Sequence, residues 1–106
     1  MKQSNDELNA YLKGIVLNLP ETPGCYQYLD EKGTIIYVGK AKNLKRRVSS
    51  YFNKDQQSRK TRLLVQHIRD IRYVVVRTEE DALLLENNLI KRYKPHYNVL
   101  LKDDKT

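Results

Sequence analysis

Tyr26 and Tyr37 lie in two short apolar segments that could bring their phenol groups together. Residues 24–30 (GCYQYLD) and 34–39 (TIIYVG) are typical of strands, and the EKG sequence between them predicts a hairpin turn. A tight turn sets Tyr26 directly across from Tyr37. A phenol can take a proton from water when nearby cations favour its phenolate form. Facing tyrosines on a sheet are more often packing than catalysis, so this pair alone favours packing.

Glu86 stands in a strongly apolar segment, ALLLENNLIKRY, whose spacing is typical of a helix. Leu83, Glu86, Asn87 and Ile90 fall on or near the predicted buried stripe of that helix. A carboxylate there costs free energy unless a cation or hydrogen-bond donors meet it. It therefore either pairs with an Arg or Lys or holds a metal ion, and the residues alone favour the ion pair.

Arg47 and Tyr51 are four residues apart, so they share one face of a predicted helix. With Lys40 just upstream, the two side chains could hold a phosphate. A guanidinium offers two planar hydrogen bonds and a fixed charge where negative charge grows in phosphoryl chemistry. The alternative is an ordinary exposed pair on a helix.

Basic residues are concentrated between positions 40 and 62, in a chain of net charge +7. Only one acid, Asp55, lies among them. Such a segment either binds a polyanion or forms a solvated helix face. If it binds DNA, the contacts outside the candidate catalytic residues come from Lys42, Lys45, Arg46, Lys54, Arg59, Lys60 and Arg62.

The elements that must position these residues follow from hydrophobic spacing, caps and breakers. The sequence predicts an N-terminal helix within residues 1–20, a third strand over 71–77, an extended segment over 96–101, and helices over 42–52, from Ser58 to about Ile68, and from Thr78 to about Tyr93. The predicted fold class is α+β, a small antiparallel sheet of about three strands flanked by helices. Residues 21–99 are expected to form the functional domain, and residues 100–106 to begin a linker to regions absent here.

Length and composition bound the remaining possibilities. A chain of 106 residues fits one domain, and its single cysteine, Cys25, excludes an internal disulfide and cysteine-rich zinc sites. Cys25 is predicted to be a small buried hydrophobe, and Tyr11, Tyr28 and Tyr73 to be core residues. The start of the chain lacks a signal-peptide pattern, and no apolar run is long enough to cross a membrane. We therefore expect a cytoplasmic protein with no membrane partner.

These residues together resemble those of the GIY-YIG endonuclease family. Gly24-Cys25-Tyr26 and Tyr37-Val38-Gly39-Lys40 match the two halves that name the family, with Cys25 in place of the usual Ile or Val. The helix residues Arg47 and Tyr51, the acidic metal ligand Glu86 and the late Asn98 follow in the family's order. The longer phrases from Pro23 to Phe52 and from Glu79 to Thr106 are similar to the UvrC-like branch.

The resemblance implies hydrolysis of a DNA phosphodiester bond on the 3′ side of a lesion, with one divalent cation, Mg²⁺ or Mn²⁺, bound by Glu86. Tyr26 is the leading candidate for general base, and Tyr37 could share that role or orient the water. The catalytic set it implies is Tyr26, Tyr37, Lys40, Arg47, Tyr51 and Asn98. Implied partners are damaged double-stranded DNA, UvrB, mainly through regions absent here, and UvrA-dependent loading; the isolated domain is expected to be a monomer.

Three alternatives stay open at this point. A shorter, Cho-like repair nuclease would carry the same domain. A non-catalytic DNA-binding module would use the basic face without a metal. A covalent enzyme would use Tyr26 or Tyr37 as nucleophile and trap DNA on the protein. A homing or restriction enzyme would need sequence-reading elements, and the sequence contains no zinc finger or separate recognition domain.

Overall fold

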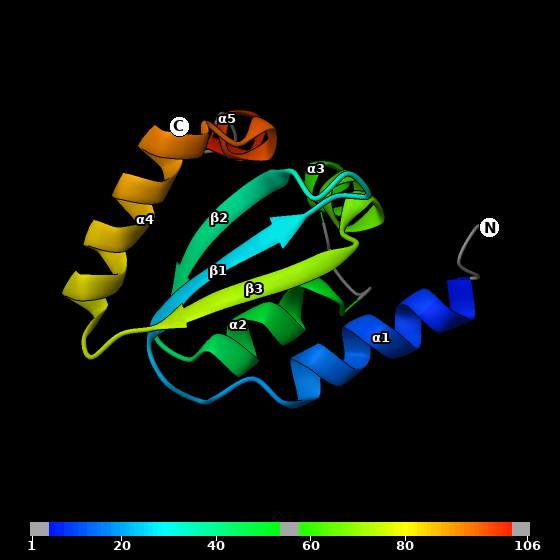
Figure 1. Ribbon diagram of the computed structural model, residues 1–106, viewed down its shortest axis with the longest axis horizontal. Helices are drawn as coiled ribbons and strands as arrows, with labels where there is room; N and C mark the ends of the chain where they lie inside the picture. The colour runs from blue at the N-terminus through cyan, green and yellow to red at the C-terminus, as the bar shows by residue number, and fades with distance from the viewer. Residues whose placement is uncertain (1–4, 54–57, 103–106) are drawn as a thin grey trace.

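The computed structural model describes residues 5–53 and 58–102 and contains one three-stranded sheet (Figure 1). Its strands are β1 (Gly24–Leu29), β2 (Ile35–Ala41) and β3 (Asp70–Val75), in the order β2-β1-β3. Both neighbours run antiparallel to the central strand. This antiparallel sheet, together with the helices that flank it, confirms the predicted α+β class. Every residue of β1 is buried, so the core lies around this strand.

The hairpin register differs from the prediction by two residues. Tyr28 lies opposite Tyr37, and Tyr26 lies opposite Gly39. The loop is longer than a tight turn, because the Asp30 N–H donates to Thr34 O at 3.0 Å. A further irregularity between Tyr28 and Leu29 adds the second residue of shift. The predicted pairing of Tyr26 with Tyr37 is wrong, but a shift of two keeps both side chains on the same face.

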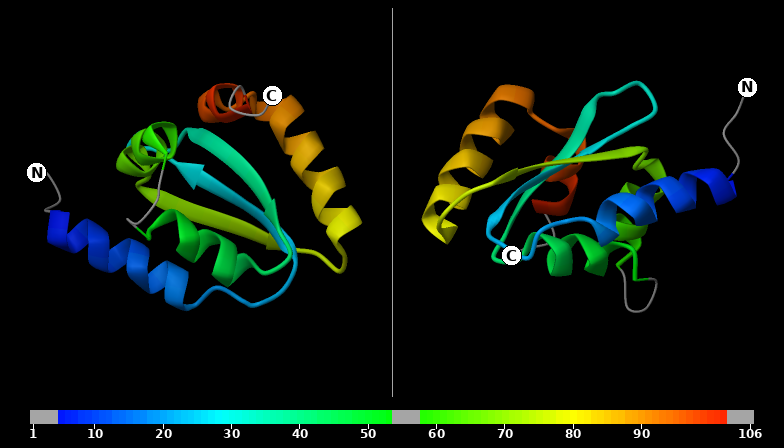
Figure 2. Two further views of the ribbon diagram at one scale, coloured as in Figure 1. Left: turned by 180° about the vertical axis from the view of Figure 1, so that it is seen from behind. Right: turned by 60° about the horizontal axis from the view of Figure 1, so that its bottom comes forward.

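In the described part of the chain, five helices flank the sheet (Figures 1 and 2). They are α1 (Asn5–Leu17), α2 (Leu44–Tyr51), α3 (Arg59–His67), α4 (Glu79–Tyr93) and α5 (His96–Lys102). α2 packs against β1 and β2, while α4 packs mainly against β2 and less against β1. α5 also packs against β2, so most contacts between helices and the sheet are made by this edge strand.

Side-chain caps begin three of the helices. Asn43 Oδ1, Ser58 Oγ and Thr78 Oγ1 each accept a hydrogen bond from the backbone N–H three residues on. The caps predicted at Ser58 and Thr78 are therefore confirmed. None of the helices in the described part of the chain is long and apolar enough to cross a membrane.

α1 ends at Leu17, inside the predicted range of residues 1–20, and the Asn18 side chain donates to Gly14 O. One predicted element is wrong. Residues 96–101 are helical rather than extended, so residues 100–102, expected to begin a linker, belong to α5. Pro95 ends α4 and also precedes a new first turn, in which the Asn98 N–H donates to Pro95 O at 3.1 Å.

Candidate functional site

Four tyrosine side chains gather on the face of the sheet that α2 covers. They come from β1 (Tyr26, Tyr28), β2 (Tyr37) and α2 (Tyr51), and their ring centroids lie 5.2 to 6.3 Å apart. Tyr26 Oη and Tyr51 Oη share a hydrogen bond of 2.8 Å, and Tyr51 Oη reaches Tyr37 Oη at 3.5 Å. The hydroxyl of Tyr51 therefore links the two tyrosines that the sequence singled out.

Gly39 makes room for the Tyr26 ring. A Cβ atom at Gly39 would lie 2.3 Å from both Cζ and Oη of Tyr26. Real Cβ atoms do not approach so closely, so only glycine lets the phenol lie against the β2 backbone. Sequence reasoning treated Gly39 only as part of a motif. The correct register, which puts it opposite Tyr26, is the signal that could have found this role.

Arg47 connects this cluster to the surface. Its Nη2 donates to Tyr51 Oη at 3.4 Å, and its Cζ lies 5.0 Å from the centroid of the Tyr51 ring. Leu44, Val48 and Tyr51 are the buried residues of α2, while Arg47 is exposed at the side of that face. A guanidinium between buried phenols and open solvent is well placed to meet an incoming phosphate.

The phenols of this cluster hold their protons firmly. Burial raises the pKa of Tyr26 to about 12, and the charge of Tyr37 acts in the same direction. The hydrogen bond with Tyr51 and the guanidinium of Arg47 oppose that shift. Burial also raises the pKa values of Tyr37 and Tyr51. The cluster is thus a protonated hydrogen-bond network that needs further positive charge nearby before Tyr26 can accept a proton.

Glu86 is half-buried on α4, the helix that packs against β2. Its negative charge contributes to the raised pKa of Tyr37 and to that of Cys25, so it acts electrostatically on both strands of the hairpin. The predicted apolar stripe is only partly correct. Leu83 is 45% exposed, because Ala82 makes the buried contact.

The donor set fits a hard, hydrated cation. Within residues 5–53 and 58–102, no three His, Cys, Asp or Glu side chains cluster as metal ligands. A cation beside Glu86 would therefore have one carboxylate and otherwise water or substrate oxygens. Mg²⁺ keeps several waters and is often held by one or two carboxylates, whereas structural zinc needs four protein ligands. The residues present accommodate the first kind of ion and not the second.

Asn98 binds the outer edge of β2. Its Nδ2 donates to Val38 O and its Oδ1 accepts from Val38 N–H, both at 2.8 Å. One amide thus replaces a neighbouring strand between Tyr37 and Gly39. The sequence placed Asn98 in the catalytic set, and both polar atoms of its amide bond to the backbone of the strand that carries Tyr37.

A basic groove of about 520 Å³ opens where β2 ends and where α2 and α4 begin. Its charged lining residues are Lys40, Lys42, Arg46, Arg47 and Glu79. Lys42 Nζ lies 3.7 Å from Glu79 Oε1, and both side chains are exposed. The groove reaches the tyrosine cluster through Arg47, which belongs to both. Of these two cations, Arg47 lowers the pKa of Tyr26 against the effect of burial, whereas the charge of Lys40 lowers the pKa of Cys25.

The other predicted DNA-binding residues do not join this groove. α3, which carries Arg59 and Arg62, lies toward the hairpin end of the sheet, away from the groove (Figures 1 and 2). Lys60 Nζ donates to Leu100 O at 3.2 Å and so ties α3 to α5. Lys45 is half-buried and does not line the groove, and Lys54 lies outside the described residues.

The fold is that of a GIY-YIG endonuclease domain. The sequence profile of the UvrC-like GIY-YIG domain matches residues 22–99. UvrABC system protein C of Bacteroides fragilis is 74% identical over 97% of the chain, and that of Bacteroides thetaiotaomicron is 76% identical over 92%. The chain covers 17% and 16% of their lengths, about a sixth.

Solved structures agree with the sequence relatives. The magnesium-bound GIY-YIG N-terminal endonuclease domain of UvrC from Thermotoga maritima has a TM-score of 0.75 and 36% identity. The match covers 92% of this chain and 98% of that one. The chain therefore belongs to the family of UvrC-like GIY-YIG domains.

Proposed function

We propose that this domain hydrolyses a phosphodiester bond 3′ to a lesion in DNA, within an excision-repair nuclease of the UvrABC type. The observation that carries this proposal is the meeting of a hydrogen-bonded phenol and guanidinium cluster with a basic groove at Arg47. The names of the relatives, UvrABC system protein C, support the repair role. The relatives' greater length leaves room for functions that this chain does not carry.

Each residue has a distinct task in the proposed reaction. Arg47 stabilises negative charge on the phosphoryl group. Tyr26 takes a proton from the attacking water, and Tyr51, which bonds to Tyr26, Tyr37 and Arg47, orients the network. Tyr37 shares the base role or positions the water, and Lys40 adds positive charge at the groove. Asn98 holds the backbone between Tyr37 and Gly39 in place.

We propose Glu86 as the one protein ligand of a divalent cation, Mg²⁺ or Mn²⁺. When bound, such an ion supplies Lewis acidity and favours deprotonation of nearby groups. The Thermotoga maritima domain was solved with its catalytic divalent cation, which is magnesium in one structure. Variants of that domain replace a tyrosine by phenylalanine or an asparagine by alanine, the residue types to which we assign roles here.

The proposed substrate is damaged double-stranded DNA, contacted in the groove by Lys42 and Arg46. UvrB is the proposed protein partner, mainly through regions outside this chain, with loading that depends on UvrA. The domain itself is expected to be monomeric and to work in the cytoplasm.

Incision of a lesion-bearing duplex in the presence of UvrA and UvrB tests this function. Glu86→Gln is expected to lower the Mg²⁺-dependent rate by at least about 100-fold, because the ion loses its one charged ligand. Glu80→Gln, the same change on the exposed first turn of α4, is the matched control and should cut normally. Undiminished cutting by Glu86→Gln contradicts the proposal, and a covalent DNA–tyrosine adduct would favour the nucleophile mechanism instead.

A further inference from the structure

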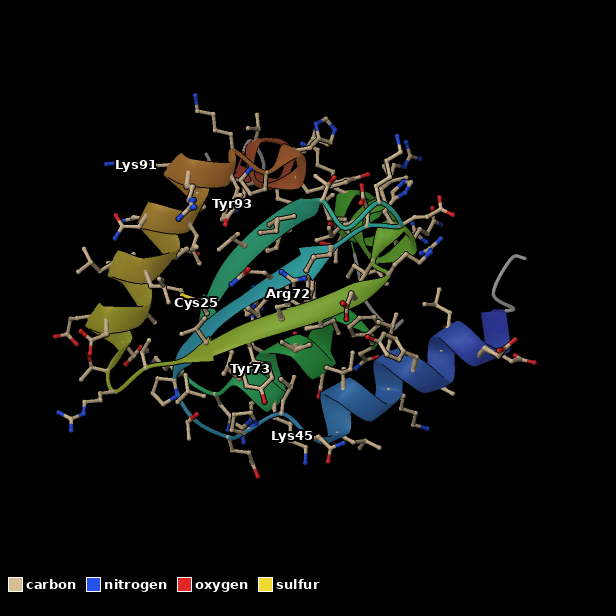
Figure 3. All side chains as sticks on the ribbon, viewed as in Figure 1. Cys25, Lys45, Arg72, Tyr73, Lys91 and Tyr93 are labelled. Carbon is tan, nitrogen blue, oxygen red and sulfur yellow. The ribbon has the colours of Figure 1, made fainter. Side chains whose placement is uncertain are left out.

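The Cys25 side chain makes a polar contact with the backbone of α4. Cys25 is fully buried, and its neighbour Tyr26 points to the opposite face of the sheet. Its Sγ lies 3.0 Å from Ala82 O, to which the thiol donates a hydrogen bond. Figure 3 shows Cys25 at the start of β1, on the side that faces α4. The strand that carries a catalytic tyrosine is therefore bonded directly to the helix that carries Glu86.

This contact falls at the point where α4 rests on the sheet. Of the residues of α4, all of which the structure describes, Ala82 is the buried one. In an α-helix the carbonyl of residue 82 is also the acceptor for the N–H of residue 86. The thiol therefore bonds to the carbonyl at the start of the helical turn that leads to Glu86.

An aliphatic side chain, which is usual at this position in the family, would pack against α4 without this hydrogen bond. A carbon approaches a carbonyl oxygen to about 3.3–3.6 Å, so α4 would then lie slightly farther from β1. The position of α4 relative to β1 therefore depends on this hydrogen bond as well as on the volume of the Cys25 side chain.

We propose that Cys25 is a positioning residue, whose thiol bond to Ala82 O fixes the place of Glu86 for binding a divalent cation. The inference rests on the proposed role of Glu86 as the metal ligand. Cys25 itself touches neither the ion nor the substrate. Its loss should therefore weaken ion binding while leaving the hydrogen bonds among the tyrosines unchanged.

The test is calorimetric titration of the whole chain with Mn²⁺, in the absence of DNA. Cys25→Ala and Cys25→Val are expected to raise the Mn²⁺ dissociation constant by about tenfold, as removal of an outer-sphere contact does. Cys25→Ser, which keeps a donor, should bind nearly as tightly as the wild type. Ile71→Val, a packing change at a buried site on β3, is the matched control and should bind normally.

A second readout follows the bond itself. Cys25 is the one cysteine of the chain, so its S–H stretch in the infrared spectrum is unambiguous and should be shifted by the hydrogen bond. An unshifted band, or full Mn²⁺ affinity in Cys25→Val, overturns the positioning role. Titration of Glu86→Gln separates the two proposals. Normal binding by Glu86→Gln overturns the metal role of Glu86 and this inference with it, whereas weak binding by Glu86→Gln with normal binding by Cys25→Ala overturns only this inference.

Discussion

β2 and β3 both pair with β1, yet only one of these edge strands contributes to the candidate site. Helices α4 and α5 cover β2, and the Asn98 amide occupies its outer edge. β3 pairs with β1 without a break in register, but Tyr73, Val74 and Val75 are exposed. Figure 3 shows Tyr73 beside β3. Tyr73 lies opposite Tyr26 and is still 42% exposed. Tyr26 is therefore part of the site because α2 covers it and Tyr51 bonds to it, and not merely because it lies in a strand.

The largest expected effect is the loss of incision rate on replacing Tyr26 of β1, compared with Tyr73 of β3. Tyr26→Phe removes the proposed base and its bond to Tyr51, and the incision rate should fall by about 100-fold or more. Tyr73→Phe, on the opposite strand, should cut at the wild-type rate. Equal incision rates for these two variants in a single-turnover assay would contradict the claim that Tyr26 belongs to the site and Tyr73 does not.

Tyr28→Phe provides a control inside the cluster. Tyr28 is fully buried, and among the described residues its hydroxyl has no hydrogen-bond partner. Its removal should leave incision unchanged and raise the free energy of unfolding by up to about 1 kcal/mol, because an unpaired buried hydroxyl is costly. A large loss of activity would mean that Tyr28 belongs to the reacting network.

Gly39→Ala should cause the next largest effect, on stability. The added Cβ would lie against the Tyr26 ring, and relief of that overlap should cost about 1–3 kcal/mol in urea unfolding. Gly14→Ala is the matched control. A Cβ at this helical glycine meets nothing within 4 Å, so it should stabilise the protein by about 0.5–1 kcal/mol. If Gly39→Ala left the free energy of unfolding unchanged, the Tyr26 ring would not lie against Gly39.

Asn98→Ala should have a smaller effect. It leaves the Val38 N–H and C=O without their side-chain partner at a partly buried site, at a cost of about 1–2 kcal/mol in the free energy of unfolding. Incision should fall less than in Tyr26→Phe, because Asn98 acts only through β2. If Asn98→Ala abolished cutting without loss of stability, the amide would have a direct catalytic role.

The sequence predicted what depends on local pattern. The hairpin, the caps at Ser58 and Thr78, and the meeting of Arg47 with Tyr51 one helical turn apart all follow from spacing and residue type. These features need only the period of a helix or strand and the chemistry of a capping oxygen.

Features that depend on distant parts of the chain escaped prediction. The irregularity beside Tyr28 shifts the register, and no local pattern reveals it. In the sequence, Lys60 looks like one more basic residue of the charged segment. Only the fold shows that it donates to the Leu100 carbonyl of α5. Tyr11 and Tyr73 were predicted to be core residues, yet both are exposed, and the Tyr11 hydroxyl donates to Asp70 Oδ1 at 2.8 Å.

The most direct test of the site is anomalous diffraction from crystals of this domain grown with Mn²⁺. We expect one manganese peak bound by the Glu86 carboxylate, with water filling most other positions, on the side of Glu86 that faces Tyr37. The peak should be absent from Glu86→Gln crystals under the same conditions. A manganese ion bound away from Glu86, or retained unchanged in Glu86→Gln, would contradict the central claim that this glutamate and the tyrosine cluster form one site.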